Sequence, residues 1–67
     1  MPIVTIKLVK PELEETQREE LIEDITELLS TKYKKARERV VVIIEPIEAY
    51  NVGFAGKTVE KIKKEGK

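Results

Sequence analysis

The sequence predicts a small α/β protein built on a βαβ unit, a class that some schemes call α+β. Three patterns predict it: apolar residues alternate over residues 2–9, an amphipathic helical stripe follows, and residues 39–45 are rich in β-branched side chains. The chain has 67 residues without an internal repeat or linker, so we expect a single domain over residues 1–67. A domain of this size buries only about 60% of its unfolded surface, and association often completes its core.

Residues 2–9 predict the first strand. Successive side chains of a strand point to opposite faces, and the larger apolar residues fall on alternate positions here. One face carries Val4, Ile6 and Leu8, and the other carries Ile3, Thr5 and Lys7.

A long helix is predicted after Pro11, which ends the strand or opens the helix because it fixes its own φ and lacks an amide hydrogen. Two interpretations of the helix start stay open. Residues 16–19 fit a capping box, and the acidic residues from Glu12 onward suit an earlier first turn. The apolar residues recur at three- and four-residue steps and form one stripe that faces the sheet. They are Leu21, Ile22, Ile25, Leu28, Leu29 and Tyr33.

Residues 39–45 predict the central strand. The run shows no polar alternation, which is typical of a strand covered on both faces. Strand, helix and strand form a right-handed crossover, so we expect parallel strands with the helix on one face. One helix cannot cover both faces, and we expect another subunit to bury the second apolar face of residues 40–44.

Residues 46–56 mix turn formers with apolar side chains. They predict a hairpin or an ordered arm that crosses onto a neighbouring subunit. Gly53 and Gly56 are expected to permit positive φ in tight turns. Residues 57–67 then predict a short helix with a frayed, lysine-rich end.

The composition excludes several classes of function. With 13 Lys plus Arg against 13 Asp plus Glu, the chain lacks the basic surface of a nucleic-acid-binding protein. Its longest apolar run, residues 40–44, is far shorter than the ~20 residues of a membrane span, so we expect a cytoplasmic protein with no membrane partner.

The chain has no Cys or His for a metal site or a His-based triad, and Asn51 replaces the first glycine of a P-loop ending at residues 56–58. We expect no metal and no cofactor. The Lys/Glu-rich, amide-poor balance is thermophile-like.

The start of the chain offers a group suited to acid–base chemistry near neutral pH. We expect methionine aminopeptidase to remove Met1, because a small residue follows it, and to leave Pro2 as a secondary amine. An α-amine has a pKa of about 7.7–8.0, and an apolar pocket lowers this value because it disfavours the charged form. Pro2 is therefore the candidate general acid and base, and its amine could also form an iminium with a carbonyl.

Four segments that together span nearly the whole chain resemble a known family of very small enzymes. They are Met1-Pro2-Ile3, Gln17-Arg18-Glu19-Glu20-Leu21-Ile22, Val42-Ile43-Ile44-Glu45 and Asn51-Val52-Gly53-Phe54-Ala55-Gly56-Lys57. In these segments the sequence is similar to the 4-oxalocrotonate tautomerase family. The resemblance implies a tautomerase/MIF-like fold, in which βαβ protomers pair into a four-stranded sheet and dimers assemble into a homohexamer, a trimer of dimers. It also implies that the amino-terminal proline moves a proton between an enol oxygen and carbon.

The resemblance also directs attention to cations that would bind a substrate carboxylate. Family members use one arginine before the helix and another in the second strand, where this chain has residues 12–13 and Val41 instead. Arg39 lies two residues before Val41 and in a strand would point to the same face about 7 Å away, so it is the first candidate. Lys10 at the end of the first strand is the second.

The family's wall aromatic aligns with Val52, and two aromatic rings lie near it in the sequence. These rings either line the pocket or pack a seam between subunits. The wall candidates are Tyr50, Val52 and Phe54.

From these residues we predict a keto–enol tautomerase that acts on a small 2-oxo or 2-hydroxy-dienoate acid, with Pro2 as general acid and base. Two alternatives stay open. The missing arginines suit a non-catalytic oligomeric assembly module. Related proline-based chemistry, such as dehalogenation or decarboxylation of a small acid, is the other.

Overall fold

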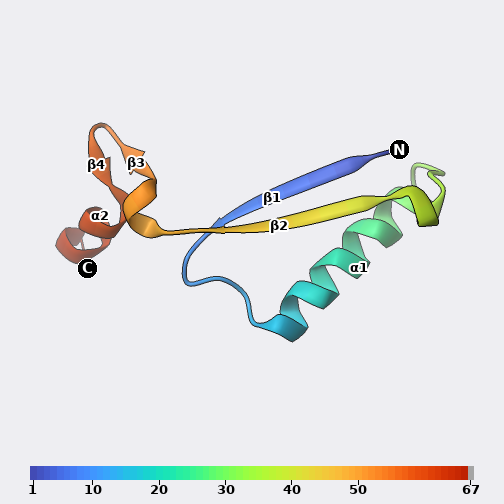
Figure 1. Ribbon diagram of the computed structural model, residues 1–67, viewed down its shortest axis with the longest axis horizontal. Helices are drawn as coiled ribbons and strands as arrows, with labels where there is room; N and C mark the ends of the chain where they lie inside the picture. The colour runs from blue at the N-terminus through green and yellow to red at the C-terminus, as the bar shows by residue number, and fades with distance from the viewer. Residues whose placement is uncertain (67) are drawn as a thin grey trace.

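The computed structural model describes residues 1–66 and confirms the βαβ unit (Figure 1). Two long strands and one long helix form the main body, and a small hairpin with a second helix follows. Short 3₁₀ turns, η1 and η2, precede β2 and β3. The elements in chain order are β1 Ile3–Val9, α1 Glu15–Thr31, η1 Arg37–Arg39, β2 Val41–Ile47, η2 Ala49–Asn51, β3 Gly53–Phe54, β4 Lys57–Thr58 and α2 Val59–Gly66.

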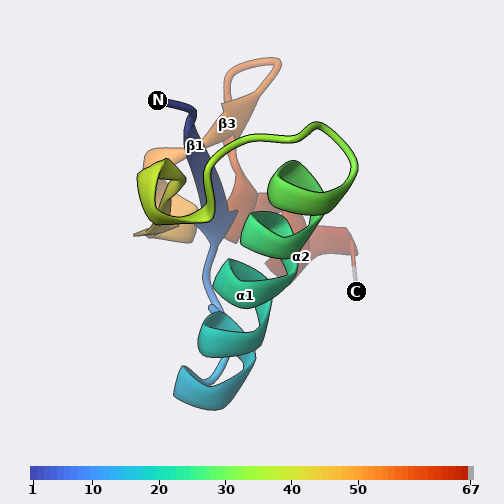
Figure 2. The same cartoon turned by 90° about the vertical axis from the view of Figure 1, so that its right-hand side faces the viewer.

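The two long strands pair in parallel, as predicted, from Ile3 opposite Val41 to Val9 opposite Ile47. Helix α1 lies along one face of this pair, which is clearest when the molecule is viewed end-on (Figure 2). The predicted alternation along β1 is confirmed, because one set of side chains is partly buried and the other is exposed. The partly buried set is Val4, Ile6 and Leu8, and the exposed set is Ile3, Thr5 and Lys7.

Helix α1 begins earlier than the capping box predicted at residues 16–19. Its N-cap is Glu14, whose backbone N–H donates to Oε1 of Gln17 at 3.0 Å. The capping box at Thr16 is therefore wrong, because Thr16 already lies inside the helix. Tyr33 was expected in the apolar stripe, but α1 ends at Thr31 and Tyr33 is 53% exposed. Ile22 and Leu28 were also expected in the stripe, but they are 39% and 45% exposed. The partly buried stripe is narrower and includes Leu21, Ile25 and Leu29, at four-residue steps.

Strand β2 begins and ends two residues later than predicted, at Val41 and Ile47. Residues 37–39 form the tight turn η1, in which the N–H of Arg39 donates to the carbonyl of Ala36 at 2.9 Å. The N–H of Val40 donates to the carbonyl of Arg37 at 3.3 Å and closes the turn. Arg39 is therefore not a strand residue.

The segment after β2 contains a hairpin, one of the two predicted forms, but it spans residues 53–58 rather than 46–56. Strands β3 and β4 pair antiparallel, and the turn between them has positive φ at Ala55 (50°) and Gly56 (86°). Gly56 is thus the expected turn glycine. Gly53 is not, because its role is close approach: a Cβ there would lie 2.9 Å from the carbonyl oxygen of Lys57. The predicted C-terminal helix is confirmed as α2, and Lys67 at its expected frayed end lies outside the described residues.

Substituting Gly53 with alanine is expected to destabilise the fold by about 1–3 kcal/mol, because the new methyl group collides with backbone that cannot move freely. Urea denaturation followed by circular dichroism measures the change. Gly66→Ala is the matched control, since a Cβ at Gly66 meets nothing within 4 Å. Equal stability of the two variants would contradict the close-approach role of Gly53.

The single chain is extended and open. No side chain in residues 1–66 is fully buried, and on the face of the sheet away from α1, Ile3 is 62% and Ile43 44% exposed. The radius of gyration is 15.5 Å, against about 11 Å for a compact domain of this length. The exposed surface is 5305 Å², against about 4,300 Å² for a compact monomer. Neither described helix is long and apolar enough to cross a membrane.

Candidate active site

Pro2 lies at the edge where the two long strands begin. It is partly buried, and its carbonyl accepts a hydrogen bond from the N–H of Val41 at 2.9 Å, which fixes it beside the first residue of β2. Met1, which is 77% exposed, makes the nitrogen of Pro2 a tertiary amide without basicity. Removal of Met1 would leave a secondary amine on a residue that the sheet already holds in place.

Arg39 lies at the same edge but in a different setting from the one predicted. It belongs to η1 rather than to a strand, so the predicted alignment of its side chain with that of Val41 is wrong. Its Cα still lies within about 7 Å of the Cα of Val41, because two residues of chain reach no farther. Arg39 is exposed, so its guanidinium is accessible to an anionic ligand.

Lys10 lies at the opposite edge of the sheet. Its backbone N–H donates to the carbonyl of Ile47 at 2.8 Å, and its ammonium pairs with Oε2 of Glu48 at 2.7 Å. The hydrogen bond to Glu48, and then the charge of that carboxylate, raise the pKa of Lys10 above its ordinary value. The raised pKa means that this pair is present at neutral pH and is lost only as the pH rises through that value. The ammonium of Lys63 also donates to the carbonyl of Lys10 at 3.3 Å.

The three wall candidates lie at the same edge as Lys10, in the segment that follows β2. Tyr50 in η2 is 58% exposed, and Phe54 in β3 is 66% exposed. Val52 lies between these elements and is partly buried, and its carbonyl accepts from the N–H of Val59 at 2.6 Å. Both rings are therefore accessible to a ligand or to another subunit.

The candidate residues thus form two groups, one where β1 and β2 begin and one just beyond where they end. Figure 1 shows how far apart these two ends of the strand pair lie. Pro2 and Arg39 make up the first group, and the second comprises Lys10, Tyr50, Val52 and Phe54. From Pro2 to Lys10 the strand rises about 26 Å, far more than the length of a small acid. Residues 1–66 of a single chain also form no enclosed pocket. One chain therefore does not bring the two groups into one site.

Sequence reasoning missed two contacts at the Lys10 end, the pairing with Glu48 and the approach of Lys63. Glu48 follows the end of β2 and Lys10 follows the end of β1, so parallel pairing was the signal that could have found the first. The second joins residues from opposite ends of the chain and has no local signal. Within residues 1–66, the carboxylates form no group of three or more able to hold a metal ion.

Comparison with known proteins adds to this geometry. The sequence model of the family described as "Tautomerase enzyme" matches residues 2–62. A probable tautomerase of Campylobacter jejuni is 62% identical over 63 residues, which cover 94% of this chain and 93% of the relative. The crystal structure of DmpI from Helicobacter pylori is 29% identical with a TM-score of 0.82, covering 94% of this chain and 97% of that one. A structure of the 4-oxalocrotonate tautomerase isozymes of Methylibium petroleiphilum has the same fold, at 19% identity and a TM-score of 0.85 over 96% and 98% of the two chains.

Proposed function

This chain belongs to the 4-oxalocrotonate tautomerase family, and on that premise we propose that it is a keto–enol tautomerase acting on a small 2-oxo or 2-hydroxy-dienoate acid. Membership of the family supports a tautomerase-type activity. The substrate class and the use of Pro2 are parts of the proposal. Its main support is the position of Pro2, which the hydrogen bond from Val41 holds at the start of β1.

In the proposed reaction Pro2 acts after loss of Met1, and the family match itself begins at Pro2. The neutral amine takes the proton from the enol oxygen, and the resulting ammonium returns a proton to carbon, so no cofactor is required. A pKa near neutrality suits both steps, because the amine must be free for the first and protonated for the second. The proposal places the enzyme in the cytoplasm, where methionine aminopeptidase acts.

The second requirement is a cation for the substrate carboxylate or for negative charge that develops on the enol oxygen. Arg39 fills this role in our proposal, because it is exposed and lies two residues from the amide that holds Pro2. The ammonium of Lys10 is the weaker candidate, since Glu48 already neutralises it.

The proposal includes a homo-oligomer, a hexamer made as a trimer of dimers, in which another copy brings the Lys10 group to the Pro2 group. Three observations support association: the exposed face that carries Ile3 and Ile43, the surface of 5305 Å² and the distance between the two groups. Apolar faces of this kind mark interfaces between subunits. Tyr50, Val52 and Phe54 would then line the site from a neighbouring chain.

The test compares two proteins of otherwise identical sequence, one that begins at Pro2 and one with a single added glycine before it, both verified by mass. Ketonisation of 2-hydroxymuconate and of phenylenolpyruvate is followed by ultraviolet absorbance. The added glycine turns the amine into an amide, and we expect kcat/KM to fall by at least about 100-fold. Equal rates would refute catalysis by Pro2. Inactivity of both proteins would favour an assembly module or proline-based dehalogenation or decarboxylation.

A further inference from the structure

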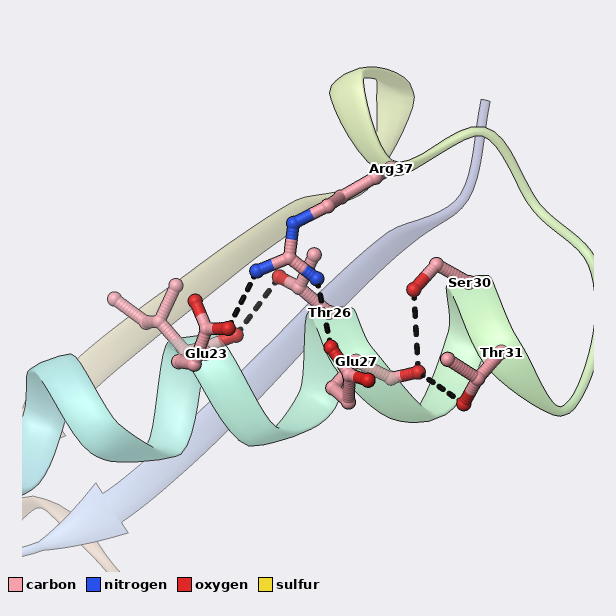
Figure 3. Close-up of polar contacts among 7 residues, drawn as sticks. Glu23, Thr26, Glu27, Ser30, Thr31 and Arg37 are labelled. Atoms are coloured by element: carbon pink, nitrogen blue, oxygen red, sulfur yellow. Dashed lines mark hydrogen bonds and ion pairs between the residues drawn. The ribbon is translucent and has the colours of Figure 1, made fainter.

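A two-carboxylate clamp ties η1 to helix α1. The guanidinium of Arg37 contacts two side chains of α1, with Nη1 at 3.0 Å from Oε1 of Glu27 and Nη2 paired with Oε2 of Glu23 (Figure 3). Glu23 and Glu27 are four residues apart and therefore lie on one face of the helix. The planar fork of an arginine offers each carboxylate its own nitrogen, whereas a lysine presents all its donors on one nitrogen.

The clamp joins α1 one turn before the helix ends. There the main-chain carbonyl of Glu27 accepts hydrogen bonds from the hydroxyls of Ser30 at 3.2 Å and Thr31 at 2.7 Å (Figure 3). The hydrogen bond and charge of Glu23, and then those of Glu27, raise the pKa of Arg37 above its ordinary value. Arg37 is therefore charged at neutral pH, where it pairs with both carboxylates.

On the other side, η1 connects directly to the residue that we assign to catalysis. The carbonyl of Arg37 accepts from the N–H of Val40 at 3.3 Å, and the next amide, that of Val41, donates to the carbonyl of Pro2 at 2.9 Å. Arg39 lies between the clamp and this bond. A continuous set of contacts therefore joins α1 to Pro2 through four consecutive residues, 37–40, and Val41.

We infer that Arg37 is a positioning residue. By bridging Glu23 and Glu27 it fixes the position of η1. The fixed η1 in turn holds Arg39 and the Val41 amide in place beside Pro2. The consequence of Arg37 for catalysis rests on the proposed function, whereas its effect on η1 does not. Residues 32–36, which link α1 to η1, are all exposed and provide little packing, and the N–H of Lys35 donates to the carbonyl of Leu29 at 3.0 Å before η1 begins. Without the clamp, η1 is expected to open more often and Arg39 to sample more positions.

The first readout is amide hydrogen exchange at Val41, measured by nuclear magnetic resonance. Arg37→Gln is expected to exchange about fivefold faster there, the size of effect that two exposed charge contacts provide. Arg37→Lys, which reaches one carboxylate, is expected to fall between Arg37→Gln and the parent protein. Lys64→Gln is the matched control, because it removes the same charge from an exposed pair with Glu60 at 3.7 Å on α2. It should leave Val41 unchanged.

The second readout separates positioning from general loss of structure. In Arg37→Gln we expect KM to rise about fivefold with kcat within about twofold, because Arg39 binds the substrate carboxylate less well. A merely structural role would lower the amount of active enzyme, and therefore kcat, without changing KM. A double-mutant cycle completes the test: in a Glu23→Gln, Glu27→Gln background, Arg37→Gln should have no further effect.

These outcomes distinguish the clamp from the proposed function. If the parent protein has no tautomerase activity, the proposed function fails, and exchange at Val41 still decides the clamp. Exchange in Arg37→Gln equal to that in Lys64→Gln overturns the inference, as does full additivity in the cycle. Should Arg37→Gln fail to fold, the Glu23→Gln, Glu27→Gln protein gives the same comparison, because it removes the clamp from the opposite side.

Discussion

Replacing Pro2 with alanine is expected to lower kcat/KM for ketonisation by about 100-fold or more, the usual contribution of a positioned general acid and base. After loss of Met1, the variant still begins with an amine. That amine is primary, better hydrated and free to rotate about its bond to Cα, whereas the ring of Pro2 prevents this rotation and so fixes the direction of the nitrogen lone pair. The measurement is the initial rate on each enol substrate by ultraviolet absorbance.

The matched control makes the same chemical change at the other end of the sheet. Pro46 is exposed, lies in β2 opposite Leu8 and has no role in the proposed site, so Pro46→Ala should keep kcat/KM within about twofold. Circular dichroism and denaturation of both variants exclude a difference in folding. If Pro2→Ala keeps the rate of the parent protein, proton transfer by Pro2 is wrong.

The face of the sheet away from α1 is called the bare face here, and a charged side chain placed on it is expected to dissociate the oligomer. Ile43 is 44% exposed in the single chain, and we expect it to be buried against another copy. Ile43→Lys would bury an unpaired ammonium there, which costs several kcal/mol or prevents association. Light scattering coupled to size-exclusion chromatography should show the parent protein as an oligomer and the variant shifted toward the mass of one chain.

Ile22→Lys is the control, because Ile22 is 39% exposed but lies on α1 rather than on the bare face. It changes the same residue type by the same charge and should leave the mass unchanged. Two results would contradict the proposed interface: a parent protein that is monomeric, or an Ile43→Lys variant with the parent mass.

The βαβ unit could be predicted because its signals are local. The alternation along residues 3–9 shows that one face of β1 is covered, and the β-branched run of β2 indicates a strand with both faces covered. Because the crossover between such strands is right-handed, the two strands must be parallel with the helix on one face. The start of α1 was not fixed by such a signal. Thr16 fits a capping box as well as Glu14 does, and only the bond from the Glu14 N–H to Gln17 separates the two.

The candidate site was predictable at one residue and less so at the others. The place of Pro2 follows from the start of β1 alone. The place of Arg39 depends on η1, which forms where Arg37 reaches back to a helix 10 and 14 residues earlier in the chain. The β-branched run of residues 39–45 gives no sign of that contact, so its pattern predicts a strand that starts at Arg39, whereas β2 starts at Val41.

The stiffness of β1 makes the proposed turnover per chain depend on the concentration of the protein. Because a strand cannot bend its two ends together, the separation of about 26 Å between Pro2 and Lys10 is a fixed property of every copy. Under the proposed assembly, turnover per chain is then set by mass action. At low concentration the cell would hold unassembled, inactive chains, and the rate would climb faster than linearly as the protein accumulates.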